Sequence, residues 1–443
     1  MTDSPTHGGA GARSNILLIT CHDLGRHLGC HGASSVSSPH LDRLAQSGLL
    51  FTNAFTTAPQ CSPARGALAT GRYPHCIGLL GLAHPPYGWD LNRGEQPVAS
   101  VLGQSGYRTH LFGFQHISPD VDRLGFQHVH VEEGRNAGEP RRRTAASLSE
   151  QVGAWLASAG MNAPFYAEVN LHETHRPYDR GDAEPYGEDD IEVPPYLPDV
   201  EESRTELAAL QGAIRQADAG VGRMLHHLDE AGLAEATAVI FVSDHGLAMP
   251  RAKCTLYDPG IEVTLMMRLP GELNRAGRRV DELVSTVSVM ATTCDLARVS
   301  IPGMVQGQSL LPLMLGEATR GEAAIFAEKT FHSYYDPMRA IRTDRHKLIR
   351  NFETTPLVEF PSDVRRSPIV RAHGDWFGRG IHPPVELYDL EKDPWEVKNL
   401  ADSRGHEDTR AGLDRRLLAW MRETGDPLLH GVPPSPRTRQ ALI

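Results

Sequence analysis

Four short segments with the pattern of β-strands, separated by polar and glycine-containing stretches, lie along the chain. They span residues 15–20, 107–112, 165–171 and 238–242. The first is a short apolar run with β-branched residues, which is typical of a strand that is buried on both faces of a sheet. The pattern therefore predicts four buried strands, and we expect the first, residues 15–20, to be parallel and central.

Between these segments, apolar residues recur at the spacing of an α-helix. Leu41, Leu44 and Ala45, for example, share one face of a helix. The same spacing predicts helices over residues 39–48, 98–106, 148–159 and 201–232. Strands that alternate with helices indicate an α/β fold, with a large mixed, mostly parallel sheet flanked by helices.

Aspartate or histidine follows each of the four predicted strands. The residues are His22-Asp23, His116, His172 with His175, and Asp244-His245. In open α/β sheets, ligands bind outside the carboxyl ends of the strands. The recurrence therefore predicts that these side chains meet in one composite active site.

The kind of secondary structure that the sequence predicts changes after Gly316. Residues 338–350 have the pattern of edge strands with basic faces, residues 387–400 that of a turn region, and residues 413–423 that of a final helix. We therefore predict a flexible tail over residues 1–14, a catalytic domain over 15–316, and a smaller C-terminal α+β domain with an antiparallel sheet over 317–443.

Composition narrows the class of protein. The 443 residues are 40% hydrophobic and carry a net charge of −11, without a basic block, so we expect neither nucleic-acid nor membrane partners. No apolar run approaches the length of a membrane span, and no secretory signal is visible. The six cysteines have no framework spacing, which predicts reduced thiols and a cytoplasmic location.

One segment organises the chemistry. Cys61-Ser62-Pro63-Ala64-Arg65 stands at the start of another predicted helix, where free amides and the helix dipole favour negative charge. A lone cysteine is most often a buried thiol, but the Cys-x-Pro-x-Arg spacing favours a functional residue. The segment, with Thr70-Gly71-Arg72 after it, resembles the signature of the sulfatase family, and the likeness extends from Asn15 to about Asp426.

The resemblance implies a particular chemistry for Cys61. In sulfatases a maturation enzyme converts this cysteine to formylglycine (3-oxoalanine), whose hydrated form is a geminal diol. A diol oxygen bound to a divalent cation becomes a nucleophile at neutral pH. The second hydroxyl can then expel the bound sulfate. The implied partners are a formylglycine-generating enzyme and a sulfated substrate.

Within the family, the chain is most similar to the heparan N-sulfatases, also called sulfamidases. The supporting stretches are residues 172–176, 335–339 and 351–352. The similarity implies that the substrate is a sulfated or N-sulfated sugar, either small or an oligosaccharide. It also implies that His332 and Arg339 bind substrate.

The family's metal ligands carry over in part. Where sulfatases have an Asp-Asp pair and an Asp-Asn pair, this chain has His22-Asp23 and Asp244-His245. The resemblance implies a metal site formed by His22, Asp23, Cys61, Asp244 and His245, with calcium as the first expectation. Two imidazoles raise the chance of manganese or zinc, and His22 could instead be a hydrogen-bond donor to the ligands.

The chain matches most of the family's catalytic positions but departs from the family at one of them. The resemblance implies that Arg65, His116, His175 and Lys253 balance charge at the sulfate, and that His175 or His116 protonates the leaving atom. The lysine that usually precedes the position of His116 is replaced by Phe114. That replacement removes one cation from the sulfate clamp.

Three alternatives compete with a sulfatase. A phosphonate monoester or phosphodiester hydrolase on the same fold would also suit the Asp244-His245 pair. The departures at His22 and Phe114 would fit a carbohydrate-binding protein whose site has decayed. A structural zinc site would use the clustered cysteines and histidines at Cys21, His22, His27, Cys30 and His31, although their spacing matches no common zinc pattern.

Overall fold

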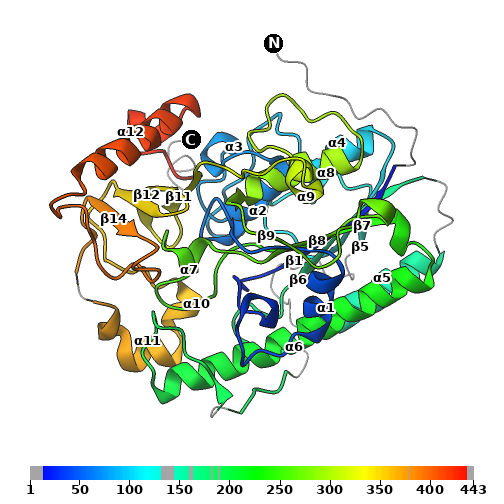
Figure 1. Ribbon diagram of the computed structural model, residues 1–443, viewed down its shortest axis with the longest axis horizontal. Helices are drawn as coiled ribbons and strands as arrows, with labels where there is room; N and C mark the ends of the chain where they lie inside the picture. The colour runs from blue at the N-terminus through cyan, green and yellow to red at the C-terminus, as the bar shows by residue number, and fades with distance from the viewer. Residues whose placement is uncertain are drawn as a thin grey trace.

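An eight-stranded mixed sheet forms the centre of the described residues (Figure 1). The computed structural model describes residues 13–130, 144–158, 163–180, 183–187, 190–378 and 380–436, so most of the predicted tail lies outside it. The order of the strands is β5 (His128–His130), β4 (Arg108–Gly113), β6 (Phe165–Leu171), β1 (Asn15–Cys21), β7 (Thr237–Ser243), β8 (Leu265–Arg268), β2 (Leu49–Phe51) and β9 (Arg278–Val280).

The prediction of a mostly parallel sheet is confirmed. β1 lies between β6 and β7 and is parallel to both. β4 is parallel to β6 and β5, whereas β8 is antiparallel to β7 and β2. Because β1, β4, β6 and β7 run in one direction, their carboxyl ends share one edge of the sheet.

Helices cover both faces of the sheet because the side chains of β1 alternate between two cores. Leu17 and Ile19 face a core with α1 (Pro39–Ser47), α5 (Ala145–Ser158) and α6 (Glu201–Glu230). Ile16 and Leu18 face a second core with α2 (Cys61–Thr70), α4 (Val98–Gln104), α8 (Val289–Leu296) and α9 (Leu311–Leu315). A strand buried on both faces explains why residues 16–19 are continuously apolar.

Shorter elements complete this part of the chain. They are β3 (Ala54–Phe55), β10 (Val284–Ser285), α3 (Pro74–Ile77) and α7 (Asp258–Ile261). β3 and β10 pair with each other in a small parallel sheet. Among the described residues, no helix has both the length and the apolar character that crossing a bilayer requires.

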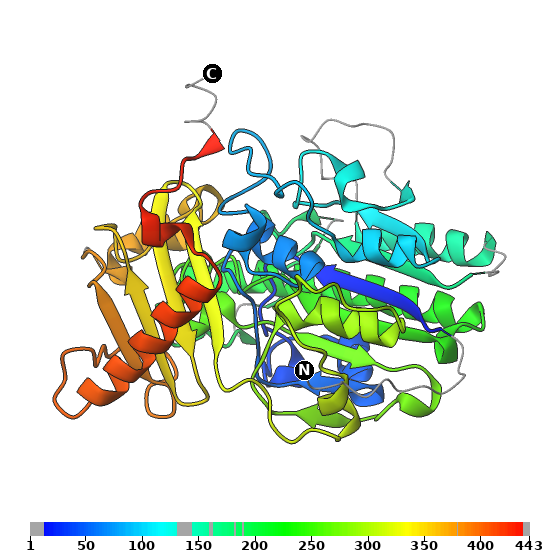
Figure 2. The same cartoon turned by 90° about the horizontal axis from the view of Figure 1, so that it is seen from above.

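A second, four-stranded antiparallel sheet lies beside the first (Figure 2). Its strands, in order, are β11 (Ile325–Phe331), β12 (Tyr335–Arg342), β13 (His346–Asn351) and β14 (Val385–Asp389). α12 (Glu407–Glu423) packs on this sheet, and the connection between β13 and β14 carries α10 (Ser362–Arg365) and α11 (Pro368–His373). The antiparallel C-terminal sheet is confirmed, while the boundary at residue 317 stays a prediction.

Two expectations for this region were wrong. β12 and β13, predicted as edge strands with basic faces, are the inner strands of the sheet. Their basic residues Arg339 and Lys347 are fully buried because they pair with carboxylates that are distant in sequence; Lys347 Nζ, for example, lies 2.8 Å from Glu396 Oε1. Residues 387–389, predicted as part of a turn, belong to β14, and the final helix begins at Glu407.

Candidate functional site

Five side chains with metal-binding atoms meet where β1 and β7 end and α2 begins. They are His22, Asp23, Cys61, Asp244 and His245, and one ligand atom of each lies within 4.8 Å of the others. All five are buried, and Cys61, the most exposed, is only 5% exposed. The structure therefore brings together the five residues that the sequence predicted as metal ligands.

Backbone hydrogen bonds fix the loops that carry these residues. The amide of His22 donates to Leu171 O at 3.2 Å, and the amide of Asp244 donates to Cys21 O at 3.1 Å. Gly25 N donates to His245 O at 2.9 Å. The ends of β1, β6 and β7 are thus joined to one another just where the polar side chains begin.

The orientation of His245 directs an electron pair into the cluster. Its Nδ1 donates to Gly246 O at 3.0 Å, so the neutral ring carries its lone pair on Nε2. Nε2 lies 3.0 Å from Asp23 Oδ1 and 3.5 Å from Cys61 Sγ. Although burial favours the neutral ring, the carboxylates of Asp244 and Asp23 raise the pKa of His245 well above its usual value.

A divalent cation fits this arrangement. A proton on Nε2 satisfies the contact with Asp23, as the raised pKa of His245 indicates, and a bound metal would replace that proton. Two buried carboxylates and at least one imidazole nitrogen supply the oxygen and nitrogen donors that calcium, manganese or zinc accept. The donor set therefore agrees with the metal that the family implies.

His22 remains open between two roles. Its Nδ1 lies 2.9 Å from Asp23 Oδ1 and 3.3 Å from Asp244 Oδ2. Nε2 is buried and has no hydrogen-bond partner among the described residues. Nδ1 can either ligate the same metal as the two carboxylates or donate a hydrogen bond to one of them.

Arg65 is held rigidly beside the cluster. Its Nε donates to Asp244 Oδ2 at 2.9 Å, and Nη1 donates to Thr20 Oγ1 at 2.9 Å and to Asn170 Oδ1 at 2.8 Å. Its Cζ lies 4.8 Å from the centroid of the Phe114 ring. Nη2 is buried without a hydrogen-bond partner among the described residues, which leaves this donor for an oxyanion.

Phe114 and His22, the two departures from the family pattern, contact each other. Their rings stack with centroids 5.5 Å apart and planes inclined by 17°. Where the family has a lysine and an aspartate, this chain therefore has two stacked rings.

Lys253 is buried between two carboxylates. Its Nζ donates to Asp23 Oδ2 at 2.9 Å and to Asp363 Oδ2 at 2.8 Å, and its side chain is only 2% exposed. Although burial opposes the charged form, both carboxylates raise the pKa of Lys253 well above its usual value. A fixed ammonium group therefore stands next to Asp23, and Lys253 is not the solvated surface lysine that is usual for a lone lysine.

His175 lies at the solvent side of this group. Its Nδ1 donates to Arg176 O at 2.6 Å, so Nε2 is the nitrogen that faces the site. Nε2 lies 3.9 Å from both Asp23 Oδ2 and Asp363 Oδ2, and the side chain is 23% exposed. Burial and the charge of Lys253 lower the pKa of His175.

Further histidines surround the cluster. His116 contacts His22 with ring centroids 5.4 Å apart, and His84 at 5.5 Å. His172 lies 5.0 Å from His22 and 4.7 Å from His175. Burial and the charge of Arg65 lower the pKa of His116 well below its usual value, so the ring is neutral near pH 7.

The two predicted substrate-binding residues have different surroundings. His332 is 7% exposed and belongs to a group with Cys254 and Glu359, close enough for its charge to contribute to the lowered pKa of His84. Arg339 is fully buried, and Asp426 pairs with its Nε and Nη2. Nη1 of Arg339 donates to Lys329 O at 2.8 Å, so all three guanidinium nitrogens are bonded to protein atoms, and Arg339 is corrected to a structural residue.

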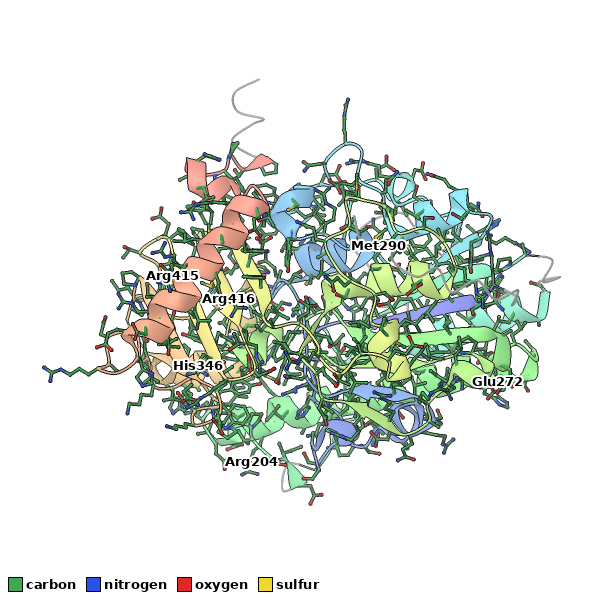
Figure 3. All side chains as sticks on the ribbon, turned by 45° about the horizontal axis from the view of Figure 1, so that its top comes forward. Arg204, Glu272, Met290, His346, Arg415 and Arg416 are labelled. Atoms are coloured by element: carbon green, nitrogen blue, oxygen red, sulfur yellow. The ribbon has the colours of Figure 1, made fainter. Side chains whose placement is uncertain are left out.

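The alternative zinc site is not formed. Among the described residues, the side-chain groups close enough to hold a metal do not include His27, Cys30 or His31. His22 instead joins the aspartates. A shallow surface groove lies elsewhere: it is lined by His346, Arg415 and Arg416 on β13 and α12 (Figure 3), and it shares no residue with the cluster.

The sequence missed two members of the site's surroundings, His84 and Asp363. Neither lies at the end of a predicted strand or in a recognisable motif. Asp363 reaches Lys253 across a sequence separation of 110 residues. No local pattern carries information about such a contact.

Known families match most of the chain. The family model described as Sulfatase matches residues 14–299, and the model described as N-sulphoglucosamine sulphohydrolase, C-terminal, matches residues 245–369. Human N-sulphoglucosamine sulphohydrolase is 28% identical, over 93% of this chain and 91% of its own length. An ulvan-active sulfatase of Formosa agariphila is 27% identical, over 94% of this chain and 76% of its own length.

A solved structure supports the same fold. The phosphonate monoester hydrolase of Agrobacterium radiobacter superposes with a TM-score of 0.72 at 22% identity, covering 93% of this chain and 96% of that one. At this identity the likeness establishes the architecture and leaves the reaction to the residues of the site.

Proposed function

The chain belongs to the sulfatase family, and on that premise we propose that it hydrolyses sulfate esters or sulfamates of sugars with a formylglycine made from Cys61 and a divalent metal ion. One observation carries the proposal. Cys61 Sγ, at the first residue of α2, lies 3.5 Å from His245 Nε2 in a buried group that also contains Asp23 and Asp244.

Asp23, Asp244, His245 and residue 61 would hold the metal, together with His22 if its Nδ1 is a ligand. Bound there, a divalent metal would acidify a hydroxyl group of residue 61 at neutral pH. Calcium is our first assignment because of the family, while the imidazole of His245 makes manganese and zinc the alternatives.

Formylglycine at position 61 would supply one hydroxyl group to attack sulfur and a second to release sulfate. Arg65 Nη2 and Lys253 Nζ are the donors that balance the negative charge on the sulfuryl oxygens. Both groups are buried and held by carboxylates, so they need no rearrangement during the reaction. His116 adds a neutral ring next to His22, with Nδ1 unpartnered among the described residues.

His175 is our choice for the general acid. Because its Nδ1 is committed to Arg176 O, only Nε2 can pass a proton to the leaving atom. The negative charge of a bound sulfate would oppose the effect of Lys253 and favour the protonated ring. We place the leaving group on this side of the site because the His175 side chain is 23% exposed.

The substrate class follows from the relatives and the net charge. We propose a sulfated or N-sulfated sugar because the relatives include a sulphoglucosamine sulphohydrolase and ulvan-active sulfatases. The chain carries a net charge of −11, so Arg65, Lys253 and the metal would attract such an anion locally. A cytoplasmic location and a formylglycine-generating partner stay predictions.

Mass analysis of the Cys61 peptide tests the proposal. The chain is produced with and without a formylglycine-generating enzyme, and the hydrolysis of an aryl sulfate is measured on both samples. We expect the thiol mass to disappear only in the co-expressed sample, and activity to follow the modified fraction. Full activity with unmodified Cys61 would reject the mechanism.

A second candidate is hydrolysis of phosphodiesters or phosphonate monoesters. His245 in the late metal pair and the absence of a cation at Phe114 favour it, because both make the site differ from the pattern that sulfatases use to bind sulfate. The same sample is assayed with an aryl phosphodiester of the same leaving group. A higher kcat/KM for the phosphodiester than for the sulfate would make this second reaction the main one.

A further inference from the structure

A carboxylate from the C-terminal region stands at the outer edge of the candidate site. Asp363, in α10, accepts a hydrogen bond from Lys253 Nζ at 2.8 Å, and the same oxygen lies 3.9 Å from His175 Nε2. The side chains of Asp23 and Lys253 are 0% and 2% exposed, whereas those of Asp363 and His175 are 18% and 23% exposed. A substrate that enters from solvent therefore meets Asp363 and His175 first.

The connection between β13 and β14 is anchored so that Asp363 keeps this position. Ile369 and Phe377 are buried in the core that also holds α5 and α6. Ile369 N donates to Glu206 Oε1 at 3.0 Å, and the other oxygen of Glu206 pairs with Arg176, the neighbour of His175. Figure 1 shows α11 beside the N-terminal end of α6. Glu206 thus ties the segment that carries Asp363 to the segment that carries His175.

The geometry lets one substrate atom contact both groups. Two atoms 3.9 Å apart, here His175 Nε2 and Asp363 Oδ2, can each be reached by a third atom at the usual hydrogen-bond distance of about 2.9 Å. Although burial opposes the charge, Lys253 lowers the pKa of Asp363, so its carboxylate is ionised and acts only as an acceptor. His175, as the general acid, must reach the leaving atom of the substrate, so that atom also lies within reach of Asp363.

A carboxylate in this place distinguishes nitrogen from oxygen. The nitrogen of a sulfamate, R–NH–SO3⁻, carries a hydrogen that it can donate to a carboxylate. The bridging oxygen of a sulfate ester carries none, and its lone pairs would face the negative charge. A site built to accept an N–H hydrogen bond discriminates strongly against an analogue that lacks it.

We propose that Asp363 determines specificity by accepting a hydrogen bond from the sulfamate N–H, so that the enzyme favours N-sulfated over O-sulfated sugars. This inference rests on the proposed sulfatase function. The attacking hydroxyl group of residue 61 loses its proton to solvent; as its oxygen bonds to sulfur, the S–N bond breaks and its electron pair goes to nitrogen, which takes the proton of His175 Nε2 and leaves as an amine. Protonation of that amine by water gives an ammonium ion, which pairs with Asp363.

The test compares two substrates with the same aryl group, an N-aryl sulfamate and an aryl sulfate. Asp363→Asn keeps the shape of the side chain and an oxygen for Lys253 but removes the charge. We expect its kcat/KM for the sulfamate to fall about 10- to 100-fold, the range of a hydrogen bond to a charged group. Its kcat/KM for the sulfate should fall much less, because only the loss of the contact with Lys253 acts on that substrate.

Glu353→Gln is the matched control, since Glu353 is an exposed carboxylate in the same connection and should change neither rate. A second readout is inhibition of aryl sulfate hydrolysis by glucosamine, whose ammonium group should bind more weakly to Asp363→Asn by a similar factor. Equal losses on both substrates, or unchanged inhibition, would reduce Asp363 to a residue that positions Lys253.

Two results with the wild-type enzyme, which keeps Asp363, distinguish a failure of this inference from a failure of the proposed sulfatase function. Wild-type enzyme that hydrolyses the sulfate but not the sulfamate would overturn the role of Asp363 and leave the sulfatase function standing. Wild-type enzyme with formylglycine that hydrolyses neither would overturn both.

Discussion

Two groups of buried charges stand in this molecule, and they differ in how completely they are paired. One is the candidate site at the carboxyl ends of β1 and β7. The other, which we call the C-terminal charge cluster, consists of His75, Glu328, Arg339 and Asp426. Both groups lie in the interior, yet their electrostatic balance is different.

The C-terminal charge cluster is balanced by its own members. Arg339 donates to both oxygens of Asp426, with its Nη2 3.0 Å from Oδ1, and lies 3.3 Å from Glu328 Oε2. Although burial favours the neutral ring, Glu328 raises the pKa of His75 to about 10, so two cations face two carboxylates at neutral pH. Such a cluster holds β11, β12 and α3 to the segment after α12.

The candidate site is paired less completely. Asp23, Asp244 and Asp363 are three carboxylates, Arg65 and Lys253 are two fixed cations, and His245, whose pKa is raised, is a third cation only while Nε2 keeps its proton. A metal bound at His245 would replace this proton, and Arg65 Nη2 and His22 Nε2 are unpartnered among the described residues. In the C-terminal charge cluster one such atom, His75 Nε2, is unpartnered, so the comparison teaches that the number of unused donors and acceptors, rather than burial of charge, distinguishes a site that needs a ligand.

The largest expected effect comes from removing a carboxylate of the candidate site. Asp244→Asn keeps the shape but lowers the negative charge that faces His22 and Arg65. We expect loss of bound metal and a fall in kcat of about 10³-fold or more, since a metal contributes several kcal/mol to the transition state. Metal analysis and steady-state kinetics check this, and circular dichroism should show an intact fold. Full metal occupancy in the variant would remove Asp244 from the set of ligands.

The opposite result is expected for the C-terminal charge cluster. Arg339→Met leaves Asp426 and Glu328 buried without their cation, which typically lowers the free energy of unfolding by about 3–5 kcal/mol. Urea denaturation measures the loss, and metal content should not change. Arg415→Met, an exposed arginine on α12 (Figure 3), is the control and should stay close to wild type. A stable Arg339→Met variant with poor substrate binding would restore the original prediction for this residue.

These differences also explain what the sequence could predict. β1, β6 and β7 were predictable because they are rich in apolar, β-branched and aromatic residues, and His22-Asp23 and Asp244-His245 follow β1 and β7 directly. Arg339 and Lys347 were misread as solvent-facing because their acidic partners lie far along the chain; Arg339 and Asp426 are 87 residues apart. Asp363 was missed for the same reason. The periodicity of apolar residues and short sequence motifs describe local structure, whereas the pairing of buried charges depends on the tertiary fold.

The pH dependence of stability gives a smaller and separate test of the C-terminal charge cluster. The pKa of His75 is about 10 in the folded chain and near 6.5 in an unfolded one. Its contribution is therefore complete below pH 6.5 and is lost as the pH rises through about 10. Between these values the free energy of unfolding should fall by about 1.4 kcal/mol per pH unit relative to His75→Gln. Urea midpoints at pH 7, 8 and 9 measure it, and parallel curves for the two proteins would contradict it.

The smallest expected effect concerns the choice of metal at the candidate site. His22 Nδ1 is 2.9 Å from Asp23 Oδ1, 3.3 Å from Asp244 Oδ2 and 4.0 Å from Cys61 Sγ. A nitrogen atom so placed can take part in the coordination of any metal that the carboxylates and His245 bind. Replacing it with a carboxylate would turn a mixed site into one with more oxygen donors.

We expect His22→Asp to raise the affinity for calcium relative to manganese on the order of 10-fold, because calcium prefers oxygen donors and manganese accepts imidazole more readily. The variant should also keep activity to lower pH, since a ligand imidazole must be unprotonated and a carboxylate loses its proton at lower pH. Calorimetric titration of the metal-free proteins with each ion measures the ratio of affinities. His226→Asp, the same change at a histidine on α6 whose side chain is 68% exposed, is the control. Identical ratios in wild type and His22→Asp would make His22 a hydrogen-bond donor and leave Asp23, Asp244, His245 and residue 61 as the protein ligands.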